Sequence, residues 1–168
     1  VYYIELDSTT LVDGREYSFV IQANDTAGNS NVSQTMNFVT DNTPPELSNN
    51  SASNVTVTGT YLLNVTVLDS HLNTSAVWFT LDDDSQGYTE MNYTGVDGYF
   101  EAYIDTTVIP NGTHTIRIKA IDLAGNANDS LILIIIVANP DNVSPEIELL
   151  YPSNGGVLAG AVVVNARV

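Results

Sequence analysis

Consecutive acidic residues offer the clearest chance of metal chemistry in this sequence. Asp82, Asp83 and Asp84 stand together at the end of an expected strand. Hard oxygen ligands gathered in one loop are what Ca²⁺ requires, so this stretch is a candidate calcium site. The alternative is a solvated acidic turn that binds no ion.

Two linker-like segments form a second calcium candidate. Segment 41–46 reads Asp-Asn-Thr-Pro-Pro-Glu and segment 141–146 reads Asp-Asn-Val-Ser-Pro-Glu. The candidate ligands are Asp41 and Glu46 in the first segment, and Asp141 and Glu146 in the second. Both segments faintly resemble the calcium-binding interdomain segments of cadherins but lack the downstream acidic motifs of that pattern. The prolines alone favour an extended, semi-rigid joint without any metal.

Catalytic chemistry has little support. The chain has no cysteine, no histidine pair at metal-ligand spacing and no glycine-rich phosphate loop. We expect His71 to be a solvated turn residue in a polar loop. His114 takes the position of Tyr17 in the repeat described next, so we expect it at the edge of the core with its ring bonded to backbone. The sequence therefore predicts no enzyme and no cofactor beyond structural Ca²⁺.

An internal sequence repeat indicates which structural elements position these residues. Residues 17–29 return as residues 114–126, a shift of about one hundred residues, which is the size of one small β-sandwich domain. The matching flanks extend the repeat. We expect the C-terminal part of one module over 1–43, a complete module over 44–140 and the N-terminal part of a following module over 141–168.

The elements expected for these modules are β-strands. Apolar residues alternate with Thr, Ser or Asn, and Gly, Pro, Asn and Asp cluster at short intervals, which is typical of antiparallel β-sandwiches. The fold class is therefore all-β, with tandem immunoglobulin-like, seven-stranded antiparallel β-sandwich modules. The strands expected in the complete module are 55–58, 61–68, 76–81, 87–93, 99–104, 113–121 and 131–137.

The Asp-x-Ala-Gly-Asn loop occurs in both copies, at residues 25–29 and 122–126. We expect Asp25 and Asp122 to bind their own turns, with the glycine supplying positive φ and the asparagine tolerating it. Calcium binding by this loop is the less favoured alternative.

Charge and composition point to an exterior protein. The net charge is −16 with only 4 Lys and Arg, so the surface repels phosphate backbones and nucleic acid is excluded as a partner. No apolar run reaches the length of a membrane span, about 20 residues. Acceptor triplets for N-glycosylation exceed chance, which indicates a glycosylated extracellular surface. They begin at Asn24, Asn31, Asn49, Asn54, Asn64, Asn73, Asn92, Asn111, Asn128 and Asn142.

Two motifs carry a resemblance to known families. Residues 11–14 (Leu-Val-Asp-Gly), followed by Tyr17-x-Phe-x-Ile-x-Ala23, resemble the second half of a fibronectin type III domain. The complete module, with its Asp-x-Ala-Gly-Asn loop and its Pro-Pro-Glu linker, is similar to immunoglobulin-like repeats of large prokaryotic surface proteins, closest to archaeal ones. That resemblance implies architecture and location. It leaves open adhesins, surface-layer proteins, filament subunits and spacers of secreted enzymes.

The last strand of the complete module indicates a partner. Strand 34–40 alternates between apolar and polar residues, whereas strand 131–137 is apolar throughout. We expect Leu133, Ile135 and Val137 to face solvent and to form an interface. These three side chains would then be covered by an adjacent module, by a neighbouring subunit, or by a loop or strand of the same domain.

The leading hypothesis is a structural, non-enzymatic extracellular protein, a subunit of a filament, sheath or surface layer that assembles through lateral β-sandwich contacts. Its partners would be further copies of itself or neighbouring immunoglobulin-like modules. The alternatives are an adhesin or receptor stalk that spaces a binding domain from the cell, and a spacer region of a secreted enzyme.

Overall fold

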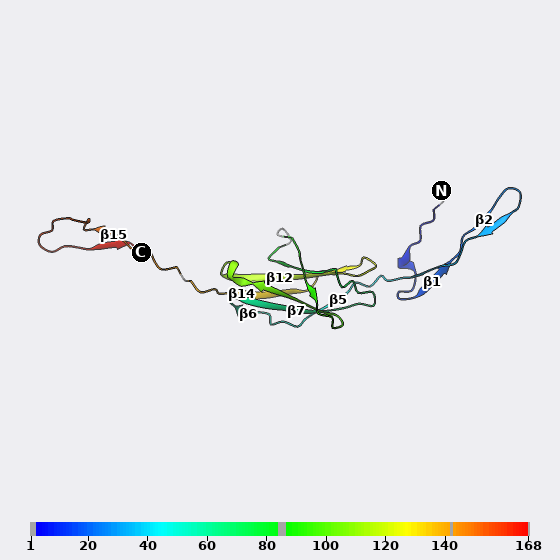
Figure 1. Cartoon of the computed structure of the whole chain (residues 1–168), viewed down its shortest axis with the longest axis horizontal. Coiled ribbons are helices and arrows are strands. Elements are labelled where there is room, and N and C mark those ends of the chain that lie inside the picture. The colour runs from blue at the N-terminus through cyan, green and yellow to red at the C-terminus, as the bar shows by residue number, and fades with distance from the viewer. Residues whose placement is uncertain (1–2, 84–86, 142, 168) are drawn as a thin grey trace.

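The computed structural model describes residues 3–83, 87–141 and 143–167. A two-sheet β-sandwich occupies the middle of the chain, with a smaller group of strands before it and another after it (Figure 1). The short 3₁₀ helix η1 (Ser8–Thr10) precedes the first strand, and η3 (Thr106–Val108) lies within the sandwich. No helix among the described residues is long and apolar enough to cross a membrane.

The sandwich has the strand order of an immunoglobulin-like domain. One sheet runs β10–β11–β7–β5, and the other runs β6–β14–β12–β8–β9 with β13 paired to β12. The first sheet contains β5 (Glu46–Asn49), β7 (Thr60–Leu68), β10 (Asn92–Tyr93) and β11 (Tyr99–Asp105). The second contains β6 (Val55–Val57), β8 (Val77–Leu81), β9 (Thr89–Glu90), β12 (Gly112–Ile121), β13 (Ala127–Asn128) and β14 (Ile132–Val137). Every pairing is antiparallel except β14 with β6. Apart from the short strands β6, β9 and β13, one sheet contains β5, β7, β11 and β10, and the other contains β8, β12 and β14. This division of seven strands into four and three confirms the predicted fold class.

The predicted strands match the observed ones with three differences. The two-residue strand β13, which pairs with β12, was not expected. Strand β5 was not expected, because its sequence Glu-Leu-Ser-Asn is too polar and short to stand out. The single strand expected over 87–93 is two short strands, β9 and β10, which belong to different sheets. Met91 lies between them with its side chain buried in the core, where the chain passes from one sheet to the other at the edge of the sandwich.

The core lies between the two sheets because alternate residues of each long strand face inward. β7 contributes Tyr61, Leu63, Val65 and Val67, and β11 contributes Phe100, Ala102 and Ile104. β12 contributes Ile116, Ile118 and Ala120 from the opposite sheet. The one polar group of β7 that enters this layer, the hydroxyl of Tyr61, donates a hydrogen bond to the Ala52 carbonyl oxygen at 2.5 Å.

The prediction that Leu133, Ile135 and Val137 face solvent is wrong. Their side chains are 1%, 0% and 2% exposed and lie in the core. The reason is register: the shift between the two Asp-x-Ala-Gly-Asn loops is 97 residues, so the apolar positions 36 and 38 of the alternating strand 34–40 correspond to 133 and 135. Because side chains alternate with period two, an error of one residue exchanges the two faces.

The strands before the sandwich form a bent hairpin. β1 (Glu16–Phe19) pairs with β4 (Met36–Val39), and β2 (Gln22–Asn24) pairs with β3 (Ser30–Val32). The Tyr17 ring stacks on the Phe38 ring at 5.7 Å between centroids. Phe19 and Ile21, the apolar residues that alternate with Tyr17 along this segment, are exposed, since no second sheet among the described residues covers them.

After the sandwich, β15 (Glu148–Tyr151) pairs with β16 (Asn165–Arg167). Both strands are exposed along their length. The boundaries proposed for the partial modules at 1–43 and 141–168 stay a prediction.

Candidate functional site at the first module joint

The linker 41–46 is held by side chains from both of its neighbours. On the hairpin side, the Asp13 carboxylate accepts hydrogen bonds from the Asn42 backbone N–H at 2.6 Å and from the Thr43 hydroxyl. On the sandwich side, the Asn126 side-chain amide donates to the Asp41 carbonyl oxygen at 3.1 Å. The Asn128 amide donates to the Pro45 carbonyl oxygen at 2.8 Å. The linker is therefore hydrogen-bonded both to the hairpin before it and to the sandwich after it.

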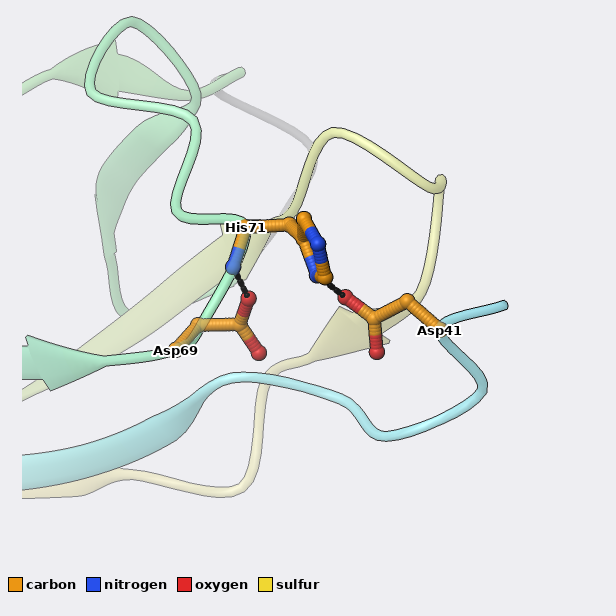
Figure 2. A group of neighbouring side chains, drawn as sticks. All are labelled: Asp41, Asp69 and His71. Atoms are coloured by element: carbon orange, nitrogen blue, oxygen red, sulfur yellow. Dashed lines mark hydrogen bonds and ion pairs between the residues drawn. The ribbon is translucent and has the colours of Figure 1, made fainter. Parts of the chain in front are cut away.

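A side-chain hydrogen bond adds to these contacts. His71 follows β7, and its ring Nδ1 donates to Asp41 Oδ2 at 2.7 Å. Asp69 orients the histidine, because its Oδ1 accepts the His71 backbone N–H at 2.6 Å (Figure 2). The Asp41 side chain is only 7% exposed and that of His71 is 35% exposed. His71 lies in a turn, as expected, but its ring is bonded to Asp41 and is not simply solvated, because the loop after β7 folds back onto the linker.

These residues border an acidic cavity of about 310 Å³. Its lining includes four carboxylates, from Asp13, Asp41, Glu46 and Asp69. The hydrogen bond from the Thr43 hydroxyl, supported by the Asn42 N–H, lowers the pKa of Asp13, so its carboxylate is ionised at neutral pH. Ionised oxygen ligands of this kind fit a hard cation such as Ca²⁺ better than a transition metal. One ligand atom each from Asp41, Asp69 and His71 lie within 4.8 Å of one another.

Of the predicted linker ligands, Asp41 and Glu46 both line this cavity, but only Asp41 belongs to the ligand group, and Glu46 is exposed. Asp41 also makes the local turn contact seen in the second linker, since its Oδ1 accepts the Thr43 N–H at 3.2 Å. Asp141 Oδ1 accepts the Val143 N–H at 2.9 Å, a local turn contact, and Glu146 is exposed. Within the described residues, the group at Asp41 is the one place where three such ligands converge.

The acidic stretch after β8 has a structural role at Asp82. Asp82 Oδ1 accepts the Thr115 N–H at 3.0 Å, and its Oδ2 lies 2.8 Å from His114 Nδ1. Asp82 and Asp83 do not belong to a ligand group in the described part of the chain, and Asp84 lies outside it.

His114 sits at the edge of the core, as expected. Its Nε2 lies 2.8 Å from the Pro110 carbonyl oxygen. Both ring nitrogens therefore face acceptors, which favours the protonated ring. The hydrogen bond to Asp82 raises the pKa of His114 against the opposing effect of burial. Burial raises the pKa of Asp82, but the hydrogen bonds from His114 and Thr115 outweigh it and lower the value.

The repeated loop is a turn, as predicted. Asp25 Oδ1 accepts the N–H groups of Ala27 and Asn29, both at 2.9 Å. In the second copy, Asp122 Oδ1 accepts the Asn126 N–H at 2.9 Å. The glycines have φ of 89° at Gly28 and 95° at Gly125, which a side chain would disfavour.

One detail of the loop prediction is wrong. Neither asparagine is among the described non-glycine residues with positive φ. Each instead donates its side-chain amide to the aspartate of its own loop, Asn29 to Asp25 Oδ2 at 2.7 Å and Asn126 to Asp122 Oδ2 at 2.8 Å. In the second copy the same amide also reaches the linker, a role that the sequence pattern did not reveal.

The predicted glycosylation sites differ in exposure. The exposed asparagines are Asn24, Asn31, Asn49, Asn54, Asn92 and Asn111. Half-buried asparagines are Asn64, Asn73 and Asn128, and Asn142 lies outside the described residues. Asn64 differs again in that its Oδ1 is buried without a hydrogen-bond partner.

Sequence comparison returned no matching family model and no matching curated protein. Solved structures give matches at low identity. Fibronectin(III)-like modules of Clostridium thermocellum CbhA align with a TM-score of 0.47 and 17% identity, over 74% of this chain and 63% of theirs. An endo-β-1,4-mannanase from Thermotoga petrophila aligns with a TM-score of 0.47 and 17% identity, over 60% of this chain and 21% of its own. The SrpA adhesin of Streptococcus sanguinis aligns with a TM-score of 0.39 and 16% identity, over 60% of each chain.

All three TM-scores are below 0.5, so the fold rests on the sheets described above and not on these matches. The chain spans about a fifth of the mannanase and under two thirds of the CbhA module structure. It is similar to fibronectin III-like and adhesin modules in architecture.

Proposed function

We propose that this chain is a non-enzymatic structural segment of an extracellular surface protein, in which immunoglobulin-like modules joined by stiff linkers form part of a filament, sheath or surface layer. The observation that carries the proposal is the first joint. Asp13 holds the linker from one side, and His71, Asn126 and Asn128 hold it from the other. A linker fixed at both ends transmits orientation between modules, which an ordered array requires.

Absence of cysteine makes the stiffness measurable by site-specific labels. Spin labels at Thr26→Cys in the hairpin loop and Val108→Cys in the sandwich should give one narrow distance distribution. Replacing both Asn126 and Asn128 with Ala should broaden it, whereas the matched control Asn92→Ala should not. A distribution that is already broad in the labelled parent chain would contradict the proposal.

A stalk that spaces a binding domain from the cell is the second candidate, and a spacer in a secreted enzyme is the third. Both need the same stiff joint. The isoleucines exposed on β14, Ile132 and Ile136, favour lateral assembly over an isolated stalk. Imaging native material decides between them, because helical or lattice order belongs to the first candidate and separate strings belong to the others.

Structural calcium at the joint belongs to the same proposal. Asp13, Asp41, Glu46 and Asp69 would hold the ion, which would neutralise their mutual repulsion. Adding Ca²⁺ after EDTA should raise the melting temperature, because a ligand bound only to the folded state stabilises it. Glu46→Gln should reduce that rise, while the corresponding change in the other linker, Glu146→Gln, should leave it intact. An equal rise in both variants would remove calcium from this joint.

Glycans would cover faces that do not assemble. The exposed asparagines Asn24, Asn31 and Asn54 are the glycosylation sites that we favour. The protein itself would lie on the cell surface of a prokaryote, which by resemblance is an archaeon. Mass spectrometry of peptides from native material tests these sites, and unmodified asparagine at all three would overturn this part.

A further inference from the structure

The outer face of β14 is apolar although its inner face already fills the core. Ile132, Ile134 and Ile136 point away from Leu133, Ile135 and Val137; Ile132 is 48% exposed, Ile136 is 39% exposed and Ile134 is half-buried. Trp78 on β8 faces the same side and is half-buried. In the first copy of the repeat, the corresponding positions hold Thr35, Asn37 and Val39. We call the outward side of β14, β12 and β8 the isoleucine face.

This face also carries the basic residues of the module. Arg117 and Lys119 are the only Lys or Arg between Arg15 and Arg167. Both lie on β12, where Arg117 pairs in register with Ile132 and Lys119 pairs with Trp78. In a chain of net charge −16, a surface that joins isoleucine to both available cations is complementary to the rest of the molecule.

The outer face of the opposite sheet has the matching character. Tyr99 and Tyr103 of β11 are 41% and 64% exposed, and Leu62 of β7, opposite Tyr103 in register, is 43% exposed. Glu101 lies between the two tyrosines on the same side of β11. Since all Lys and Arg of the module are on the isoleucine face, this tyrosine face has acidic charge only. We define the tyrosine face by the outward residues of β11 and β7.

We propose that the isoleucine face of one copy packs on the tyrosine face of a second copy of this chain, with Arg117 and Lys119 near the second copy's Glu101. The occupant follows from charge complementarity, because two isoleucine faces would bring the same two cations together. A contact between two different faces is heterologous, so it can repeat from copy to copy, and it generates an open filament or layer where the rotation does not close a ring. The inference rests on the proposed structural function and names the surfaces that would serve it.

Glycosylation limits this arrangement in a way that can be checked. Asn64 and Asn92 both pair with Glu101 in register, one on each side. A glycan on either would occupy the tyrosine face, so the proposal requires both to be unmodified in assembled material. Intact glycans at Asn64 in native assemblies would overturn it.

Cross-linking identifies the two faces directly. Two single-cysteine chains, Ile134→Cys and Tyr103→Cys, are mixed and treated with a short bifunctional maleimide. The proposal expects cross-links mainly between position 134 of one chain and position 103 of the other. Cross-links mainly between two copies of the 134 variant would overturn it in favour of two isoleucine faces meeting, and an absence of cross-links at concentrations where the chain associates would overturn both faces.

Charge reversal supplies a second readout. Arg117→Glu and Glu101→Lys should each weaken self-association, measured by sedimentation equilibrium, about tenfold, and the double variant should recover most of the loss. Val108→Asp, at an exposed apolar position away from both faces, is the matched control and should change nothing. Failure of the double variant to recover would contradict the pairing. If native material still shows lattice order under either negative result, the structural function stands and only these faces are wrong.

Discussion

The two copies of the repeat, residues 12–46 and 110–146, share an antiparallel strand pair and a turn, but only the second copy buries one side of its strands in a core. In both copies, the strand pair before and after the Asp-x-Ala-Gly-Asn loop is antiparallel. The aspartate of each loop accepts hydrogen bonds from its own turn. The two copies differ in how deeply these contacts are buried, and burial decides how much each contact contributes to stability.

Tyr17 and His114 illustrate how one position keeps its role with different chemistry. The Tyr17 hydroxyl accepts the Val12 N–H at 2.8 Å. At the corresponding place in the second copy stands Pro110, which has no N–H, and His114 bonds to its carbonyl oxygen instead. The second copy thereby gains a titratable group where the first has none in the neutral range.

The joints differ in charge in the same way. Asp13 accepts the Asn42 N–H in the first joint, and Asn111 Oδ1 accepts the Asn139 N–H at 2.6 Å in the second. An amide therefore stands where the first joint has a carboxylate. The acidic cavity therefore belongs to the first joint, whereas a side-chain oxygen that accepts a backbone N–H is common to both joints.

The largest predicted effect separates the two faces of β14. Ile135→Ala should destabilise the sandwich by about 2–5 kcal/mol, because it leaves a cavity in the core. Ile134→Ala, one residue away on the outer face, should cost about 1 kcal/mol or less. Urea unfolding followed by tryptophan fluorescence from Trp78 measures both. Similar losses at the two positions would contradict the assignment of inner and outer faces.

The second effect separates the two loops. Asp122 is 2% exposed and Asp25 is exposed, although they make the same contacts to their own asparagines. Asp122→Ala should cost about 2 kcal/mol, since buried donors lose a charged acceptor. Asp25→Ala should leave the main unfolding transition of the sandwich unchanged. Equal effects in thermal melting would show that burial against the linker adds nothing.

The core residues could be predicted where apolar and polar residues alternate along a strand, and could not be predicted where they do not. The sequence predicted the sandwich and most of its strands, because most inward positions of β7, β11 and β12 are apolar and many of the positions between them are polar. In β14 every residue is apolar, so the pattern contains no information about which side faces inward, and only the register with β12 decides it.

The candidate site was predictable only in part. The linker acids Asp41 and Glu46 are visible in the sequence because they recur at 141 and 146. Their partners Asp69 and His71 come from the loop after β7, and no local pattern links that loop to the linker. Such contacts between distant segments depend on the packed structure. The amide contacts of Asn126 and Asn128 with the linker were missed for the same reason.

A smaller effect concerns pH and the difference between Tyr17 and His114. The folded state raises the pKa of His114, so the pair with Asp82 stabilises fully below the unfolded histidine value of about 6.5, and the contribution is lost as pH rises through the folded value. The lowered pKa of Asp82 acts in the opposite range: its contribution is present above about 3.8 and is lost as pH falls through the folded value.

Stability from this pair should therefore be greatest in mildly acidic solution and should fall toward neutral pH. His114→Tyr, which installs the residue of the first copy, should flatten the difference in melting temperature between pH 5 and pH 8 that this pair contributes. An unchanged pH profile in that variant would show that the pair does not titrate as described.

The smallest effect tests whether the two joints differ by one carboxylate. Asp13→Asn gives the first joint the amide that the second joint already has, and Asn111 shows that an amide oxygen can accept the same backbone N–H. The variant should therefore fold with nearly the parent melting temperature in EDTA, whereas Asp13→Ala should melt lower because the Asn42 N–H and the Thr43 hydroxyl lose their acceptor. With Ca²⁺ added, Asp13→Asn should gain less stability than the parent chain, since one of four carboxylates around the cavity is neutral. A full calcium response in Asp13→Asn would mean that the Asp13 carboxylate serves only to hold the linker, and the two joints would then be equivalent at this position.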